Sequence, residues 1–321
     1  MTDGPEPIPD WPGEFVSLGD YQVFVRTVPA AGGEPALCVH GLAGSSRNWT
    51  DLMNRLRPGL DCAAVDLPGY GYSPPRPDRR YTISAFAQTL VTLIERQGRG
   101  PVHLIGNSLG GAVCARLAAR RPALIRSLTL ISPALPDLYP RLDLVRFPVM
   151  SIPRVGGWAL DKFKNISSER RVANVLATCY YDRSVVHPAR FAAEVAELDR
   201  RDNVPYADES LLGGMRSLTA ESLRPLGPWR EASRIIAPAL IIYGSDDRLV
   251  NPRMAGRAAR TIRGSRVVVM PRTGHVAMME HPRLVAAEMA ILLGGIPAGS
   301  GRLHEGTGTE NGEHSVAAAA G

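Results

Sequence analysis

The sequence predicts an α/β protein with a doubly wound, mostly parallel sheet and an inserted helical cap. Short runs of β-forming residues alternate with helical patterns along most of the 321 residues. Most of these runs are apolar nearly throughout, which is typical of parallel strands that helices cover on both faces. The alternation stops after residue 132 and resumes near residue 233 with the same character. This interruption indicates an insertion into one α/β unit.

Seven strands are expected, at residues 21–28, 36–41, 61–69, 102–108, 125–132, 239–245 and 265–271. Helical patterns separate them, and the clearest are the runs ISAFAQTLVTLIERQ and RLVAAEMAILL. These elements predict an α/β core formed by residues 14–132 and 233–294. Prolines, aromatic residues and helix-like pieces dominate residues 133–232, which are therefore predicted to form the cap.

The two chain ends have the composition of loose segments. Residues 1–13 are rich in acids and prolines, and residues 295–321 are rich in glycine, polar residues and alanine. We expect a flexible leader and a disordered tail, neither with a functional role. The leader lacks the basic end and the apolar run of a signal peptide, and no apolar stretch approaches the roughly 18 residues of a membrane span. The sequence therefore predicts a cytoplasmic protein.

The charge distribution argues against nucleic-acid binding. The net charge is +6, but the arginines are scattered, and pairs such as Arg79-Arg80 are the densest runs. Membrane contact is expected only as transient binding of a lipid surface through the cap, and the sequence leaves the oligomeric state open. The chain has no CxxC pair, GxGxxG, Walker loop or HExxH, so neither a metal nor an organic cofactor is expected.

One motif at a predicted strand end is typical of a nucleophile. Gly106-Asn107-Ser108-Leu109-Gly110 ends a strand and opens a helical pattern. A sharp turn of this kind lifts the serine hydroxyl above the sheet, and the flanking glycines remove side chains that would collide. A bare GxSxG arises readily by chance, so the prediction depends on its strand–turn–helix context.

Three other strand ends supply the groups that such a serine needs. Ligands of open α/β sheets bind at the carboxyl ends of the strands. The turn after His40 can bring the backbone N–H of Leu42 beside that of Leu109, so that both face a developing oxyanion. A serine also needs a base, and an imidazole base needs a carboxylate. Asp246 and Asp247 follow one strand, and His275 follows another behind a glycine.

The remaining histidines fit structural roles. His40 is expected to shape its turn by packing and hydrogen bonding, and His103 to be a satisfied core histidine. The others precede prolines or lie in the tail: His187, His281, His304 and His314.

Five segments together resemble the α/β-hydrolase superfamily, in its cap-bearing esterase and lipase-like branch. They are HGLAGSSRNW, DLPGYGYS, GNSLGG, YGSDDRLVNP and GHVAMMEHP, in this order, and the resemblance covers residues 14–294. It implies a catalytic triad with Ser108 as nucleophile, His275 as base and Asp247 as orienting acid. It also implies an oxyanion hole formed by the backbone N–H groups of Leu42 and Leu109.

Two other carboxylates could take the place of the triad acid. Asp247 is the fourth residue of its G-x-x-D turn, which favours it over Asp246. Asp137 follows the strand at residues 125–132, a position that some branches of the superfamily use for the acid.

The resemblance implies a serine hydrolase that cleaves a small-molecule carboxylic ester with an apolar acyl group, through an acyl-enzyme and without a cofactor. Relatives that dehalogenate or open epoxides have an aspartate at the nucleophile position. Because this chain has Ser108 there, those two activities are disfavoured. One alternative is hydrolysis of a carbon–carbon bond in meta-cleavage-type diketones. Another is a non-hydrolytic small-ligand receptor or scaffold, because fold alone does not decide function.

Overall fold

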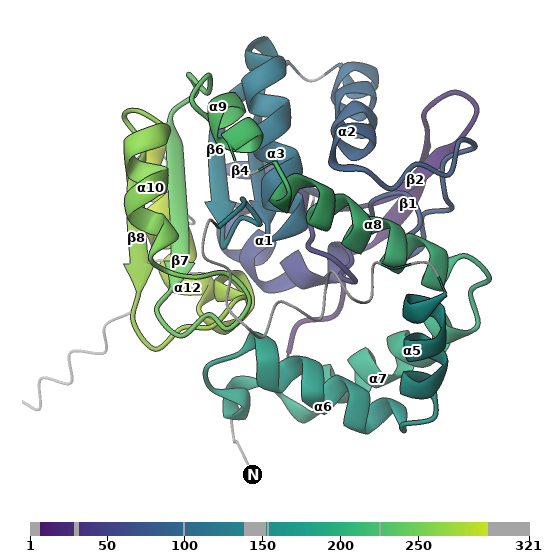
Figure 1. Ribbon diagram of the computed structural model, residues 1–321. Coiled ribbons are helices and arrows are strands. Elements are labelled where there is room, and N and C mark those ends of the chain that lie inside the picture. Colours follow the sequence, from purple (N-terminus) through teal and green to yellow (C-terminus); the bar gives the residue numbers. More distant parts are fainter. Residues whose placement is uncertain are drawn as a thin grey trace, which may run out of the picture.

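The computed structural model describes residues 7–28, 32–98, 100–137, 152, 154–224 and 226–294. Its centre is an eight-stranded sheet with the order β1-β2-β4-β3-β5-β6-β7-β8 (Figure 1). β2 runs antiparallel to both of its neighbours, and the other neighbouring pairs are parallel. The strands are β1 (Gly13–Ser17), β2 (Gln22–Thr27), β3 (Glu34–Val39), β4 (Leu60–Val65), β5 (Val102–Asn107), β6 (Ile125–Ile131), β7 (Ala239–Gly244) and β8 (Arg266–Met270).

Strands β2 to β8 lie where the sequence predicts them, and most of their ends agree to within about two residues. The sequence does not predict β1. The residues of β1 are mostly exposed, and the strand lies at the edge of the sheet, paired with β2 alone. An edge strand of this kind lacks the buried apolar run that identifies the central strands. The doubly wound, mostly parallel sheet is confirmed.

Helices cover both faces of the sheet. α2, α3, α9 and α10 pack on one face, and α1, α11 and α12 pack on the other. No helix within the described ranges is both long enough and apolar enough to cross a membrane. The helices are α1 (Thr50–Leu56), α2 (Ile83–Gln97), α3 (Leu109–Arg120), α5 (Val155–Lys164), α6 (Ser168–Cys179), α7 (Pro188–Asp202), α8 (Ala207–Ser222), α9 (Leu226–Ala232), α10 (Met254–Thr261), α11 (Ala277–Glu280) and α12 (Pro282–Leu292).

Four described helices between β6 and β7 form a layer within the segment that the sequence predicts as a cap. The bounds of the cap stay a prediction, and residues 138–151, 153 and 225 lie outside the described residues. α5, α6, α7 and α8 lie beyond the carboxyl ends of the parallel strands (Figure 1). α9 differs from them, because its Trp229 and Ala232 are buried in the core beside α3. The indole N–H of Trp229 donates to the carbonyl of Pro136, 2.8 Å away. The cap helices are thus placed directly over the edge of the sheet where the candidate residues were expected.

The described part of the predicted leader links the cap to the core. Arg190 of α7 donates to the carbonyl oxygen of Ile8 at 2.8 Å. Asp10 pairs with Arg190 and also with Arg47, at 3.2 Å and 2.7 Å. The mobility expected of the two chain ends stays a prediction, and residues 1–6 and 295–321 lie outside the described residues.

Candidate active site

Ser108 sits at the sharp turn between β5 and α3. Its backbone has φ 53° and ψ −118°, a conformation that is rare and strained for a residue with a side chain. Its N–H donates to the carbonyl of Ile131 at 3.1 Å, which ties the turn to β6. A Cβ atom at Gly106 would lie 2.6 Å from the sulfur of Cys114, and one at Gly110 would lie 2.3 Å from the carbonyl oxygen of Val39. The two glycines of the motif are therefore sterically required.

We expect Gly110→Ala to lower the free energy of unfolding by about 3 kcal/mol, near the upper end of typical overpacking costs, because the added methyl group would collide with backbone carbonyls that cannot turn away. The shift of the urea midpoint at pH 7 measures this effect. Gly157→Ala in α5 is the control, since open space surrounds that position and alanine favours a helix interior by roughly 0.5–1 kcal/mol. A Gly110→Ala protein as stable as wild type would contradict the steric argument.

His275 and Asp247 form a buried hydrogen-bonded pair. Nδ1 of His275 donates to Oδ2 of Asp247 at 2.9 Å, and the Asp247 side chain is fully buried. Oδ1 of Asp247 accepts the backbone N–H groups of Leu249 and Val250, at 2.8 Å and 2.9 Å. Burial alone would raise the pKa of Asp247, but the charge and hydrogen bond of His275 and the N–H of Val250 hold it below its usual value. Because Nδ1 carries this bond, Nε2 is the nitrogen left to act on another group.

The other two candidate carboxylates lie in different surroundings. Asp246 is exposed and accepts the hydroxyl of Ser245 at 2.6 Å. Asp137 lines the cavity described below and pairs with Arg253 at 3.1 Å. Asp247 is the carboxylate that the structure bonds to His275.

Four hydrogen bonds that the sequence did not reveal connect the histidine loop to its surroundings. The N–H of His275 donates to the carbonyl of Cys179 at 2.6 Å, and Nδ2 of Asn107 donates to the carbonyl of His275 at 3.1 Å. The carboxylate of Glu280 accepts the N–H of Gly274 at 2.6 Å and that of Tyr181 at 3.0 Å. Cys179 and Tyr181 belong to the cap segment, so the cap and the histidine loop are joined directly.

Both ring nitrogens of His40 are engaged by backbone. Nδ1 donates to the carbonyl of Gly41 at 2.7 Å, and Nε2 accepts the N–H of Leu67 at 3.0 Å. Burial lowers the pKa of His40. Because Nε2 accepts a hydrogen bond, the ring is neutral. His103 is likewise buried and bonded, to Ser127 at 2.8 Å and Glu34 at 2.9 Å. Both histidines have the structural roles that the sequence predicts.

The turn that follows His40 passes beside Ser108. A Cβ atom at Gly41 would lie 3.1 Å from Cβ of Ser108. Leu109 is the first residue of α3, where the N–H has no partner within the helix. Leu42 lies in the turn itself, and no described residue accepts a hydrogen bond from the N–H of Leu42 or of Leu109. Two backbone donors near the serine are therefore available to an incoming group.

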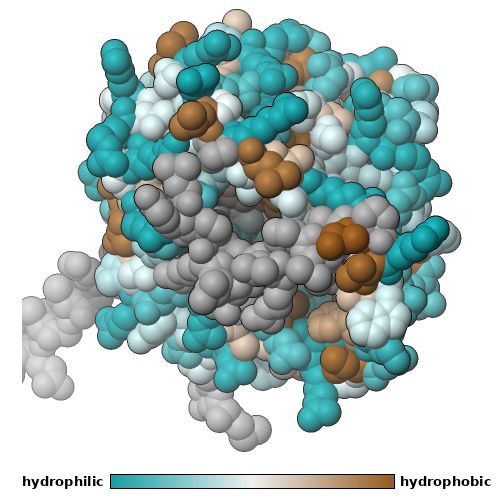
Figure 2. Space-filling model, in the orientation of Figure 1, coloured by the Kyte–Doolittle hydropathy of each residue, from teal (hydrophilic) through white to brown (hydrophobic). Residues whose placement is uncertain are grey.

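A cavity of about 760 Å³ lies between the core and the cap, and Ser108 and His275 both line it. Figure 2 shows a hollow near the centre of this face of the molecule, with apolar side chains at its margin. Ser108 and His275, which both lie within the described ranges, form no hydrogen bond with each other. Apolar side chains make up much of the wall, among them Leu42, Leu135, Leu176, Leu218, Val250, Met254 and Met278.

Nothing in the described part of the chain resembles a metal centre, because no three His, Cys, Asp or Glu side chains gather there in a suitable group.

Residues 35–282 match the family described as alpha/beta hydrolase fold.

Among curated proteins, the chain is 30% identical over 254 residues to the pimeloyl-[acyl-carrier protein] methyl ester esterase of Neisseria meningitidis, covering 78% of this chain and 88% of that one. It is 26% identical over 297 residues to a monoacylglycerol lipase of Xenopus laevis, covering 87% and 81%. Among solved structures, 2-hydroxy-6-oxo-6-phenylhexa-2,4-dienoate hydrolase from a Rhodococcus strain has a TM-score of 0.72 at 18% identity, covering 88% of this chain and 99% of that one. The family match, which spans most of the chain and every segment of the site, shows that this protein is a member of the alpha/beta hydrolase family.

Proposed function

We propose that this protein is a serine hydrolase that cleaves a carboxylic ester through Ser108, His275 and Asp247. The observation that carries the proposal is the buried hydrogen bond between His275 and Asp247, in a cavity that the strained Ser108 also lines. A neutral imidazole held by a buried carboxylate is the base that a serine hydroxyl needs at neutral pH.

The proposed reaction has two steps. Nε2 of His275 takes the proton of the Ser108 hydroxyl as its oxygen attacks the ester carbonyl, and the Leu42 and Leu109 N–H groups stabilise the resulting oxyanion. Collapse breaks the bond to the alcohol, which leaves with the proton from His275, and an acyl group remains on Ser108. His275 then takes a proton from water, whose oxygen attacks the acyl-enzyme. As the bond to Ser108 breaks and the carboxylic acid leaves, His275 returns that proton to the Ser108 oxygen.

The cavity wall supports an apolar acyl group. Leu176 of α6 and Leu218 of α8 line it from the cap, and Met254 of α10 lines it from the core. The names of the Neisseria and Xenopus relatives both describe hydrolysis of esters that contain an acyl chain. These names favour ester hydrolysis over cleavage of a carbon–carbon bond.

A fluorophosphonate probe tests the proposal together with a panel of p-nitrophenyl esters of increasing acyl length. We expect the esters to be hydrolysed and the probe to attach to one residue, Ser108, as located by peptide mass spectrometry. Ser222 lines the same cavity, so Ser222→Ala is a matched control that should keep both the turnover and the labelling. Ester turnover that survives without a reactive Ser108 would overturn the proposal.

The same panel separates the alternatives. A vinylogous diketone that is cleaved faster than every ester would assign the triad to carbon–carbon bond hydrolysis. Tight binding of a small ligand without turnover of any ester or diketone would instead support the receptor or scaffold.

A further inference from the structure

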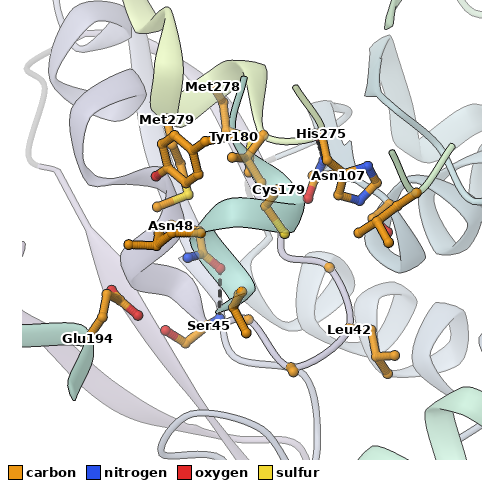
Figure 3. Close-up of a pocket in the computed structure, with 18 of the residues that line it drawn as sticks. Leu42, Ser45, Asn48, Asn107, Cys179, Tyr180, Glu194, His275, Met278 and Met279 are labelled. Carbon is orange, nitrogen blue, oxygen red and sulfur yellow. Dashed lines mark hydrogen bonds between the residues drawn. The ribbon is translucent and has the colours of Figure 1, made fainter. Parts of the chain in front are cut away.

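The cavity contains a carboxyl group that the proposed reaction does not use. Glu194 lies on α7 of the cap and lines the cavity. In Figure 3 its carboxyl points into the cavity beside Ser45, on the opposite side from His275. Among the described residues, none donates a hydrogen bond to this carboxyl. Glu194 is half-buried, and a carboxyl that faces a cavity without a protein donor can take its hydrogen bond from a ligand.

The neighbouring arginines, Arg47 and Arg190, donate no hydrogen bond to the carboxyl of Glu194. Nε of Arg47 lies 2.7 Å from Asp10, and Arg190 pairs with Asp51 at 3.1 Å. The charges of these guanidinium groups affect the pKa of Glu194 without a direct hydrogen bond. Burial raises the pKa of Glu194, and the charge of Arg47 opposes that effect.

Asn48 adds a donor to the same part of the cavity. Its Oδ1 accepts the backbone N–H of Ser45 at 3.0 Å, which is the dashed line in Figure 3. This bond fixes the amide and leaves Nδ2 as the free donor, for which the described residues offer no acceptor. Asn48 lines the cavity on the same side as Glu194 (Figure 3). An acceptor and a donor thus lie at one end of the cavity.

Mostly apolar side chains form one wall between this end and His275. In Figure 3 the side chains between the two ends are Cys179 and Tyr180 of the cap and Met278 and Met279 of α11. A ligand that follows this wall from Ser108 to Glu194 would contact it through an apolar stretch and end at a polar group.

We propose that Glu194 and Asn48 form a subsite for a hydroxyl group of the substrate, separated from the scissile ester by an apolar stretch. A hydroxyl both donates to a carboxyl and accepts from an amide N–H, so it satisfies the two groups together. An ammonium group would leave Asn48 without an acceptor, and a carboxylate would be repelled by Glu194 once that group is ionised. This inference rests on the proposed ester hydrolysis.

Two matched series of esters test the subsite. The first contains p-nitrophenyl esters of fatty acids of increasing length, each with and without a terminal hydroxyl. The second contains butyrate esters of straight-chain alcohols, again with and without a terminal hydroxyl. The measured quantity is the ratio of kcat/KM for the two members of a pair, which does not depend on the fraction of active protein. At the fitting length we expect a ratio of roughly tenfold or more. The series that shows it tells whether the hydroxyl belongs to the acid or to the alcohol.

Glu194→Leu should bring this ratio to about one while the unsubstituted esters are still hydrolysed. Asp199→Leu, on the exposed face of the same helix, should leave the ratio unchanged. If the leucine variant does not fold, Glu194→Gln keeps an acceptor oxygen and should lower the ratio without abolishing it.

The outcomes separate the subsite from the catalytic proposal. Hydrolysis of the unsubstituted esters with no preference for a hydroxyl at any length in either series overturns the subsite alone. A preference that persists unchanged in the Glu194 variants also overturns it. The absence of any ester hydrolysis overturns the proposed function on which the subsite rests.

Discussion

We expect Ser108→Ala to lower kcat for a p-nitrophenyl ester by about 10⁶-fold, as the loss of the nucleophile does in other hydrolases with this triad. The substitution removes one oxygen and leaves His275, Asp247 and the two backbone donors in place. Steady-state kinetics at saturating ester measure the effect, with circular dichroism to verify the fold. Alanine adopts the same backbone conformation at no greater cost than serine, so stability should change little.

The Ser222→Ala variant provides the comparison, because it removes a hydroxyl from the same cavity wall at a position outside the turn. It should retain turnover within a few-fold of wild type. If Ser108→Ala kept more than a small fraction of wild-type kcat in protein free of wild-type enzyme, another residue would have to be the nucleophile.

The turn that holds Ser108 could be predicted because its constraints are local. A Cβ atom at Gly106 would lie within 3 Å of atoms of α3, and one at Gly110 would lie within 3 Å of the end of β3. Any serine that such a turn presents is subject to the same steric limit. The pairing of His275 with Asp247 was also predictable in outline, since both follow parallel strands that end at one edge of the sheet. The choice among Asp247, Asp246 and Asp137 was not settled by the residues alone, because it depends on which carboxylate turns inward.

The groups that come from the cap could not be predicted from the sequence. Glu194 lies in an amphipathic helix with several other acids, and nothing in that pattern distinguishes the carboxyl that faces the cavity. Glu280 lies within the GHVAMMEHP segment, but its role depends on the N–H of Tyr181, which is 99 residues away. Such contacts are set by how the cap packs on the core, and a single sequence carries no local signal of that packing.

We expect Asp247→Asn to lower kcat by about 10⁴-fold, the size of the effect that the same substitution has in a serine protease triad. The asparagine amide can donate to Nδ1 of His275, which places the ring proton on Nε2 and leaves no base for the Ser108 hydroxyl. The neutral amide also cannot stabilise the imidazolium that forms during attack. The labelling rate with the fluorophosphonate should fall along with kcat, because both depend on the same proton transfer.

The fold should survive this substitution, which makes the kinetic result interpretable. Asparagine retains an oxygen to accept the N–H groups of Leu249 and Val250, two of the bonds that hold the side chain in its turn. Asp246→Asn and Asp137→Asn are the matched controls, and each should stay within a few-fold of wild type, since one carboxylate is exposed and the other pairs with Arg253. A collapse of turnover in Asp137→Asn with Asp247→Asn unaffected would instead assign the acid to the end of β6, and the bond to His275 would then be structural.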